Sequence, residues 1–370
     1  MLDAARAFAA NVIVPNAAAW EHERRYPREA FAAAAKAGLC GLLVAPEYGG
    51  VGLGVVAMAE VMETLAAADY AFAMSLLVHN NLGGNISRNG SEAQCARWLP
   101  AVLAGESLGA FLLTEPGGGS DAAAIACAAR RDGDDWVLDG AKSWVSNAAS
   151  ADLLSVYAQT GTSADWRGIA CFLVPTYTPG VVREDAYAML GGHALGTGGI
   201  RFEGCRVGDD AALLPPERAF KAAMAGIDIA RINVAAMCAG MLRAGLDIAV
   251  AATAAKSAFG QKLADFQGLR WQLADVATNA HAARLMAYDA AAALDRGENV
   301  TVAAAHAKKF ATRVALDGLA QCMQALGANG LCHDTPLPRH LAGAKMAQYI
   351  DGTTEIQNVV IARDLWNRAN

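Results

Sequence analysis

Apolar residues in the first hundred positions recur three and four apart, which is the period of an amphipathic helix. The first repeat consists of Ala5, Phe8, Ala9 and Val12. Proline interrupts the pattern at Pro15 and Pro27, and a glycine-rich stretch interrupts it at 46–54. We therefore predict a helical first domain over residues 1–108.

From about Gly109 to Val207 the pattern changes to short runs rich in β-branched and aromatic residues. The runs are Phe111-Leu-Leu, Trp136-Val-Leu, 153–157, 169–174 and Ile200-Arg-Phe. Turns are expected between them at Asp132-Gly133, Asp139-Gly140 and Pro179-Gly180. The pattern predicts an all-β middle domain over 109–212, either barrel-like or a sandwich.

Long alanine-rich segments of helical period follow Pro215 and Pro216 and continue to residue 370. They are separated near Gly260, near Gly297 and over 327–338. Short connections between long helices favour antiparallel neighbours, so residues 213–370 are predicted to form a four-helix bundle. The chain is accordingly expected to be an α+β multidomain protein in the order α, β, α.

Composition narrows the classes of function. Apolar residues make up 54% of the 370 and charged residues 18%, and the many alanines favour helix packing over membrane insertion. Apolar stretches such as 55–59 and 234–242 are shorter than the roughly 18 residues that a spanning helix needs, so no membrane partner is expected. The net charge of −6 comes without a basic stripe, which argues against nucleic acid as a partner.

Targeting and metal-site signals are weak. Residues 1–8 carry Asp3 and show no basic region followed by an apolar one, so a cytoplasmic protein is expected. The eight cysteines form no C-x-x-C pair, and the seven histidines form no H-E-x-x-H motif. We therefore predict neither a disulfide framework nor a metal site.

The densest local signal is the loop at 113–121, Leu-Thr-Glu-Pro-Gly-Gly-Gly-Ser-Asp, which follows an expected strand. Three consecutive glycines let backbone N–H groups approach a bulky or anionic group that a Cβ would exclude. The hydroxyls of Thr114 and Ser120 flank these glycines. The loop is a candidate for cofactor binding, and a flexible β-turn is the alternative.

A second signal is the segment 142–147, Lys-Ser-Trp-Val-Ser-Asn. Regular strand alternation would place Trp144 and Ser146 on the same face. An indole ring beside a hydroxyl suits a flat, polar ring system. Taken alone, however, a tryptophan such as Trp144 is more often a core residue.

A third signal lies at 349–357, Tyr-Ile-Asp-Gly-Thr-Thr-Glu-Ile-Gln. Thr353 or Thr354 would cap a following helix, with Glu355 in its first turn. Asp351 lies just outside that helix. A carboxylate held there in an apolar cleft would have a raised pKa and would suit a general base.

In this order, on an α, β, α chain of this size, the three signals resemble the acyl-CoA dehydrogenase family over nearly the whole chain. Further matching stretches are 38–54, Phe172-Leu-Val-Pro with Thr178-Pro-Gly, Phe259-Gly-Gln and 324–330. Val78-His-Asn-Asn-Leu is similar to members that act on short or branched acyl groups. The resemblance implies an FAD enzyme that desaturates an acyl thioester next to its carbonyl.

The resemblance also implies roles for individual residues. Asp351 occupies the position of the base that removes the α-proton while the β-hydride passes to flavin N5. Within the subunit, FAD would contact Phe111, Leu113, Thr114, Gly119, Ser120, Trp144, Ser146, Thr353 and Glu355. A neighbouring subunit would contribute Lys256, Phe259, Gln324, Gly327 and Ala328, which implies a homo-oligomer, either a dimer or a tetramer.

The thioester is placed by the same resemblance. Its contacts would be Ser120, Asp228, Arg231, Ile350 and Gly352. Without the resemblance, Arg231 and Asp228 could equally form a helix-surface ion pair at i, i+3. Electrons would pass onward to an electron-transfer flavoprotein.

This chain departs from the family pattern at several positions. Asp351 stands where most members carry glutamate, and Ala230 offers no second carboxylate at the alternative base position. Other departures are Lys256 for arginine, Ala328 for glycine, and Ala342-Gly343 for an Arg-Asp pair. Three alternatives therefore stay open: a dehydrogenase for acyl groups on an acyl carrier protein, a flavin oxidase resembling nitroalkane oxidases, and a helical assembly protein without FAD.

Overall fold

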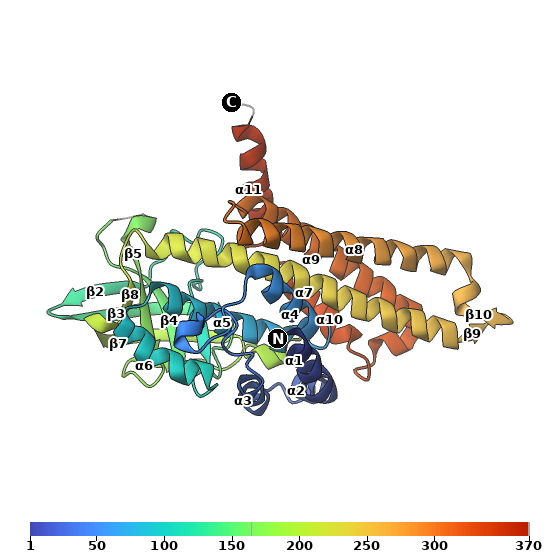
Figure 1. Ribbon diagram of the computed structural model, residues 1–370, viewed down its shortest axis with the longest axis horizontal. Helices are drawn as coiled ribbons and strands as arrows, with labels where there is room; N and C mark the ends of the chain where they lie inside the picture. The colour runs from blue at the N-terminus through green and yellow to red at the C-terminus, as the bar shows by residue number, and fades with distance from the viewer. Residues whose placement is uncertain (164, 369–370) are drawn as a thin grey trace.

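The computed structural model describes residues 1–163 and 165–368. Helices at both ends of the chain flank a sheet, so the predicted fold class with its α, β, α order is confirmed. The sheet lies at one end of the elongated molecule, and long helices extend from it to the other end (Figure 1). The three domain boundaries remain predictions.

The N-terminal part is helical as predicted, but the break expected at Pro15 does not occur. Its helices are α1 (Leu2–Phe8), α2 (Val14–His22), α3 (Arg28–Lys36), α4 (Val55–Ala66), α5 (Tyr70–Asn89) and α6 (Glu92–Leu103). A π-helical turn at Ala9–Ile13 joins α1 to α2. Pro15 lies in the first turn of α2, where a missing N–H is tolerated, and the π turn keeps the backbone helical before it.

The β middle part is a mixed sheet with eight strands among the described residues. Its strands are β1 (Gly109–Leu112), β2 (Ala128–Asp132), β3 (Asp135–Val145), β4 (Leu153–Gln159), β5 (Ile169–Pro175), β6 (Val181–Arg183), β7 (Gly198–Gly208) and β8 (Ala212–Leu214). Their order is β6-β7-β3-β2-β4-β5-β8, and β1 pairs with β4 in parallel. Four of the five β-rich runs fall within one of these strands, and the fifth, Phe111-Leu-Leu, extends one residue beyond the end of β1.

Asp139-Gly140 is not a turn, contrary to the prediction. Both residues lie inside β3, where the pairing with β7 shifts register between Leu138 and Gly140. Gly140 has a φ of 141°, and a Cβ there would lie 2.7 Å from the Cα of Cys127. The glycine therefore marks a β-bulge where two backbones approach closely. In the sequence alone, an Asp-Gly pair at such a bulge looks the same as an Asp-Gly pair in a turn.

The C-terminal part is a bundle built around one very long helix. Its helices are α7 (Ala219–Ala255), α8 (Gln267–Asp295), α9 (Thr301–Leu326), α10 (Leu337–Ala347) and α11 (Thr354–Asn367). α7 is 37 residues long, and at 1.5 Å per residue it spans roughly 55 Å. It runs from the sheet to a small hairpin of β9 (Ser257–Ala258) and β10 (Gln261–Lys262) at the far end (Figure 1).

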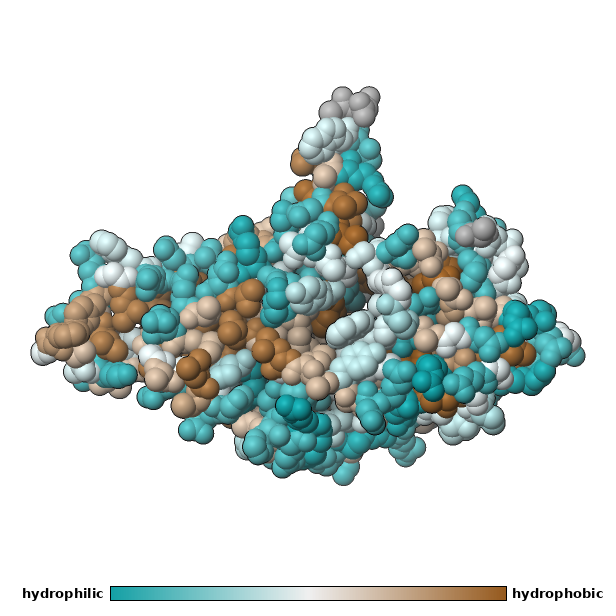
Figure 2. All heavy atoms as spheres, turned by 180° about the vertical axis from the view of Figure 1, so that it is seen from behind, coloured by the Kyte–Doolittle hydropathy of each residue, from teal (hydrophilic) through white to brown (hydrophobic). Residues whose placement is uncertain are grey.

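By length and composition alone, α7 is apolar enough to cross a membrane. Its most apolar window is 61% buried inside the protein, which is the behaviour of a core helix. No other helix among the described residues passes the same test. By contrast, α11 projects from the body, and Figure 2 shows apolar surface on it, where Val359, Leu365 and Trp366 are exposed.

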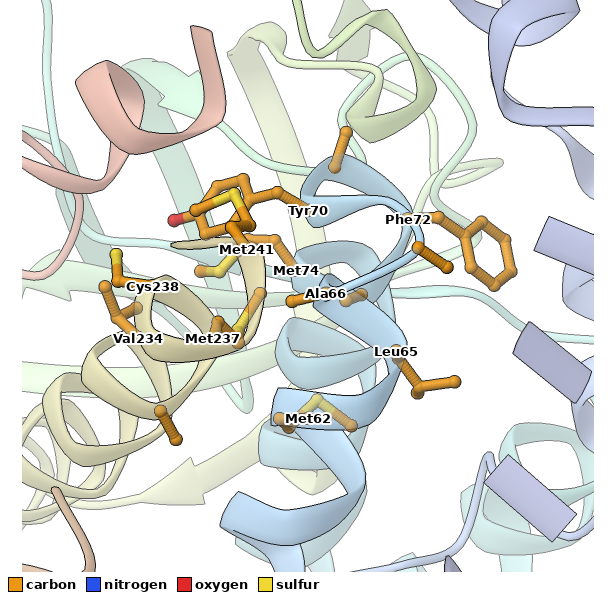
Figure 3. Close-up of a cluster of buried hydrophobic side chains, with 14 of the residues drawn as sticks. Met62, Leu65, Ala66, Tyr70, Phe72, Met74, Val234, Met237, Cys238 and Met241 are labelled. Carbon is orange, nitrogen blue, oxygen red and sulfur yellow. The ribbon is translucent and has the colours of Figure 1, made fainter. Parts of the chain in front are cut away.

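The N-terminal helices and the bundle share one core. Met62 of α4 lies beside Met237 of α7 in a cluster of buried side chains that also contains Met241, while Leu65 lies on the opposite side of α4 in the same cluster (Figure 3). The helices approach closely, since a Cβ at Gly240 of α7 would lie 2.3 Å from a backbone oxygen of α4. A shared core of this kind fixes the position of α7 relative to the first helices.

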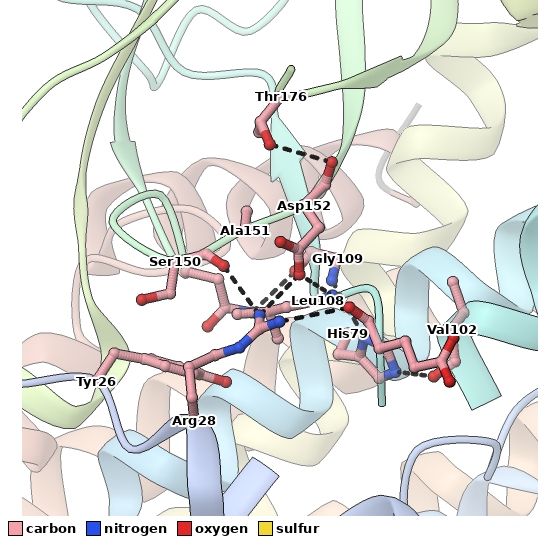
Figure 4. Close-up of polar contacts among 12 residues, drawn as sticks. Tyr26, Arg28, His79, Val102, Leu108, Gly109, Ser150, Ala151, Asp152 and Thr176 are labelled. Carbon is pink, nitrogen blue, oxygen red and sulfur yellow. Dashed lines mark hydrogen bonds and ion pairs between the residues drawn. The ribbon is translucent and has the colours of Figure 1, made fainter. Parts of the chain in front are cut away.

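Polar contacts fix the sheet against the N-terminal helices. Arg28 donates to the Oδ2 of Asp152 at 2.7 Å, and the same carboxylate accepts the N–H of Leu108 at 2.8 Å (Figure 4). His79 of α5 accepts the N–H of Gly109 at 3.1 Å and contacts the carbonyl of Val102 at 3.1 Å. Burial lowers the pKa of His79 to about 4, so the ring is a neutral structural link at the start of β1.

One buried carboxylate of α4 offers a test of this packing. The Glu63 carboxylate is buried, and it accepts the hydroxyl of Tyr288 at 2.6 Å and the guanidinium of Arg284 at 3.0 Å. Tyr288→Phe removes a hydrogen bond to a charged group, so we expect the free energy of unfolding to fall by about 1.5–3 kcal/mol. Urea denaturation measures this, with Tyr177→Phe as the control at an 80% exposed tyrosine. Equal effects of both variants would contradict the assigned contact.

Candidate functional site

The glycine loop after β1 is held at its base by a buried ion pair. Lys142 of β3 donates to a carboxylate oxygen of Glu115 at 2.8 Å and to the carbonyl of Leu113 at 2.9 Å. Glu115 also accepts the backbone N–H groups of Ala126 and Cys127 at 2.7 and 2.8 Å. Burial alone would raise the pKa of Glu115, but the Lys142 ammonium and these two amides lower it on balance.

The loop above this ion pair is open. A Cβ at Gly117 or Gly118 would meet no atom within 4 Å, whereas one at Gly119 would lie 3.0 Å from the Cγ2 of Thr114. Gly119 therefore allows the loop to fold back over Thr114, and Ser120 is exposed next to it. The geometry leaves the backbone of the loop accessible, as expected for a loop that binds a ligand rather than one that fills a core.

Trp144 is exposed, so the interpretation of this residue as core is wrong. Its side chain is 64% exposed and meets Tyr187 edge to face at a centroid distance of 5.0 Å. The strand alternation assumed for it also fails, because Trp144 has a φ of 56° and β3 ends at Val145. Ser146 lies in the turn that follows, half-buried. An indole of this exposure near an open loop is typical of a ring that covers a ligand.

Asp351 lies in a short turn between α10 and α11. Its backbone is left-handed, with a φ of 55°, and the next residue, Gly352, has a φ of 92°. This turn directs the carboxylate inward, where its Oδ2 is buried with no hydrogen-bond partner among the described residues. Burial raises the pKa of Asp351 to about 6, although Lys308 and Arg231 act in the opposite direction.

Three side chains hold this turn by its carbonyl oxygens. Arg231 donates to the carbonyl of Asp351 at 2.9 Å, and Lys308 donates to the carbonyl of Gly352 at 2.7 Å. Gln357 also donates to Gly352, at 2.8 Å. The two cations thus bind consecutive backbone carbonyls, of Asp351 and Gly352, and leave the Asp351 carboxylate free. A Cβ at Gly352 would crowd Arg231 and Gln357 at about 3 Å, so glycine is required there.

Arg231 and Asp228 pair as the sequence suggested, but inside the protein. Arg231 donates to Asp228 at 2.9 Å, and both side chains are largely buried, so a surface ion pair is excluded. Asp228 also accepts the hydroxyl of Thr301 at 2.7 Å. Asp228 and Thr301 lie at the edge of a cavity of about 420 Å³, lined further by Trp166, Phe220, Lys221, Met224 and Ala225. Arg231 therefore connects this cavity to the turn that carries Asp351.

The other residues assigned to cofactor contacts divide into two groups. Phe111 and Leu113 belong to the β1 region, while Thr353 caps α11 and Glu355 is exposed in its first turn. Lys256, Phe259, Gln324, Gly327 and Ala328 lie at the far end of α7 and α9 instead. A Cβ at Gly327 would lie 3.8 Å from the ammonium of Lys256, and Phe259 is 96% exposed. One chain therefore does not bring the two groups together.

Lys308, Gln357, Glu115 and Lys142 were missed by sequence reasoning. Lys308 could have been found, because it continues the apolar positions Ala304, Ala311 and Ala315 along one face of α9. A lysine on such a face is buried and needs a partner. No comparable signal exists for Glu115, whose partner comes from a strand 27 residues away.

The ion pair under the glycine loop gives a direct test. Lys142→Met leaves Glu115 buried without its cation, so we expect the free energy of unfolding to fall by about 3–5 kcal/mol, and the pKa of Glu115 to rise. The double variant Lys142→Met/Glu115→Gln removes the uncompensated charge and should recover part of the loss. Denaturant titration measures all three proteins. A double variant less stable than Lys142→Met would contradict the ion pair.

Comparisons with known proteins agree with this arrangement. Models of the N-terminal, middle and C-terminal domains of acyl-CoA dehydrogenases match residues 1–106, 110–205 and 218–366. The mitochondrial short-chain specific acyl-CoA dehydrogenase of Bos taurus is 37% identical over 97% of this chain and 88% of its own length.

Two solved structures are similar over nearly the whole chain. Butyryl-CoA dehydrogenase from Megasphaera elsdenii has a TM-score of 0.94 and 32% identity, covering 99% of this chain and 97% of its own. Glutaryl-CoA dehydrogenase from Mycobacterium smegmatis, solved in complex with FADH2, has a TM-score of 0.93 and 28% identity, covering 98% and 93%. The chain therefore belongs to the acyl-CoA dehydrogenase family of FAD-dependent oxidoreductases.

Proposed function

We propose that the protein desaturates a short or branched acyl-CoA thioester, with Asp351 as the base that removes the α-proton. The observation that carries the proposal is the free, buried Oδ2 of Asp351. A pKa of about 6 keeps this carboxylate largely ionised at neutral pH and still basic enough to accept a proton. Its two neighbouring cations bind backbone carbonyls, so they do not occupy the oxygen that the reaction needs.

The chemistry of a thioester sets the remaining requirements. Its α C–H is a weak acid, so the developing negative charge on the carbonyl oxygen needs hydrogen-bond donors. The backbone N–H groups of Asp351 and Gly352 find no acceptor among the described residues and are available for this purpose. Bound FAD would supply the acceptor for the β-hydride at its N5. Arg231 would hold the turn and, through Asp228, the edge of the cavity of about 420 Å³, which we propose receives the thioester's carrier.

The residues near the glycine loop fit FAD. The exposed Trp144 indole offers a face to a flat ring, and the open 117–119 backbone offers N–H groups to phosphate. Ser143 Oγ is buried beside the loop with no partner among the described residues, and its N–H donates to the carbonyl of Thr114. We propose that these residues, with Phe111, Leu113, Ser120 and Ser146, line the cofactor site.

We further propose a homo-oligomer in which a second copy completes that site. Lys256 and Phe259 follow the far end of α7, with Gly327 beside Lys256, whereas Trp144 lies at the end of β3 in the sheet, near the opposite end of the elongated molecule (Figure 1). The exposed apolar side chains of α11 supply a surface for such contacts. An electron-transfer flavoprotein is proposed to accept the electrons.

Asp351→Asn tests the base. The amide cannot take up the α-proton, so we expect anaerobic bleaching of the flavin by butyryl-CoA to slow by about 10²–10⁴-fold. Stopped-flow absorbance measures the rate, with the parent enzyme and Asp364→Asn on α11 as controls. Bleaching by Asp351→Asn at the parental rate would show that the base is wrong.

Three further measurements distinguish the dehydrogenase from the open alternatives. Preference for acyl groups on an acyl carrier protein over CoA esters would favour the carrier-protein enzyme, and oxygen consumption with a nitroalkane would favour an oxidase. A colourless protein that cannot be reconstituted with FAD would favour an assembly role and contradict the dehydrogenase.

Lys308→Met tests the electrostatics of the base. The positive charge of Lys308 lowers the pKa of Asp351, so its removal raises that pKa. Because the ionised carboxylate is the reactive form, we expect kcat/KM of the parent to fall as the pH drops through about 6. This acidic limb of the pH profile should move to higher pH in Lys308→Met. Lys309→Met on the same helix is the control, and Lys308→Arg should restore the parental limb. An unchanged limb in Lys308→Met would contradict the coupling.

A further inference from the structure

Tyr70, the first residue of α5, carries a hydroxyl without a function in the fold. The side chain is only 2% exposed, and its Oη has no hydrogen-bond partner among the described residues. A buried hydroxyl without a partner is destabilising, and phenylalanine would fill the same space without that cost. The hydroxyl is therefore a candidate for contact with a ligand.

The surroundings of Tyr70 are apolar. Its ring lies against Met74 of α5 and Met241 of α7, and the hydroxyl points to the side of α7 that carries Cys238 (Figure 3). A Cβ at Gly343 of α10 would lie 2.9 Å from the Cβ of Tyr70, so the glycine makes room for this tyrosine. Residues of three helices thus fix the ring, and the hydroxyl is not in contact with solvent.

The Tyr70 hydroxyl lies on the side of α7 that binds the Asp351 turn. It points toward Cys238, which follows Arg231 on α7 by seven residues and so lies on the same helix face. Arg231 donates to the carbonyl of Asp351 at 2.9 Å. Burial raises the pKa of Tyr70 well above its usual range, so the phenol stays protonated and is a donor. The Tyr70 hydroxyl and Asp351 Oδ2 are both buried and unpaired, and they do not bond each other. A donor and an acceptor are therefore left on the same inner face.

We propose that Tyr70 determines specificity by donating a hydrogen bond to an oxygen or nitrogen atom of the acyl group beyond its β carbon. The inference rests on the proposed function, since it places the thioester's α carbon at Asp351. An acyl-group atom that contacts the Tyr70 hydroxyl but not Asp351 then lies further from the thioester than the α and β carbons. With an alkyl chain the hydroxyl stays unpaired among methionines, so the enzyme selects a polar acyl group.

Acyl pantetheine thioesters test this proposal, because both candidate carriers contain pantetheine. Matched pairs differ by one ether oxygen in place of a methylene at C4 or C5, such as 4-methoxybutyryl against hexanoyl. We expect the parent enzyme to bleach at least one ether substrate faster than its alkyl partner. Tyr70→Phe should reduce that ratio by about tenfold and leave the alkyl rate unchanged or higher.

Thermal unfolding of the substrate-free holoenzyme supplies a second readout. Tyr70→Phe should leave the Tm unchanged or raise it, because no hydrogen bond is lost. The control is Tyr26→Phe, which should lower the Tm, since the Tyr26 hydroxyl bonds Ser75 at 2.9 Å. A fall in Tm for Tyr70→Phe with an unchanged substrate ratio would assign the hydroxyl a structural role and overturn the proposal.

The experiments distinguish failure of the proposed dehydrogenase function from failure of the proposed role of Tyr70. If no thioester bleaches the parent flavin, the proposed function fails and the role of Tyr70 fails with it. If thioesters bleach the parent and Asp351→Asn abolishes the reaction, but no ether substrate is preferred or Tyr70→Phe leaves the ratios unchanged, only the role of Tyr70 is wrong.

Discussion

The turn that carries Asp351 is held by two buried cations that bind its carbonyl oxygens rather than its carboxylate. Arg231 and Lys308 come from α7 and α9, which pack against each other in the bundle, so the position of Asp351 depends on how those helices meet. A cation bound directly to the carboxylate would have lowered its basicity and blocked it. Binding the backbone instead fixes the turn in its left-handed conformation and keeps the side chain available.

The same helix α7 connects several parts of the candidate site. Near its sheet end it lines the cavity that contains Asp228, further along it carries Arg231 and packs on α4 at Gly240, and its far end leads to Lys256. A helix of this length is stable only when neighbours bury its apolar face over most of its length. The shared core of the N-terminal helices and the bundle provides that burial, so packing far from Asp351 also determines where Asp351 lies.

The sequence predicts the order of elements well because helix and strand periods are local properties. Every β-rich run coincides with a strand, apart from Leu113 at the end of the first run, and the long segments predicted after Pro216 are helical. Pro15 and Asp139-Gly140 were misassigned because a π turn and a β-bulge use the same residues as a helix break and a hairpin turn. Which of the two forms occurs is decided by neighbouring strands and helices, not by the dipeptide.

The residues of the candidate site likewise differ in whether local sequence reveals them. Asp351, Arg231 and the glycine loop stand out locally, whereas the partners Lys308, Glu115 and Tyr70 acquire their roles only through contacts between distant segments. The exposure of Trp144 likewise follows from a left-handed residue at the end of β3, which no pattern of alternation anticipates.

The buried state of Asp351 has a thermodynamic consequence for the whole chain. Its pKa is higher in the folded protein, at about 6, than the ordinary value of 3.8, so the folded state binds a proton more tightly than the unfolded state does. This group's contribution to stability is therefore fully present below pH 3.8 and is lost as the pH rises through about 6. At neutral pH the ionised Asp351 carboxylate is a source of instability, which a bound ligand would offset if it donated a hydrogen bond to that carboxylate.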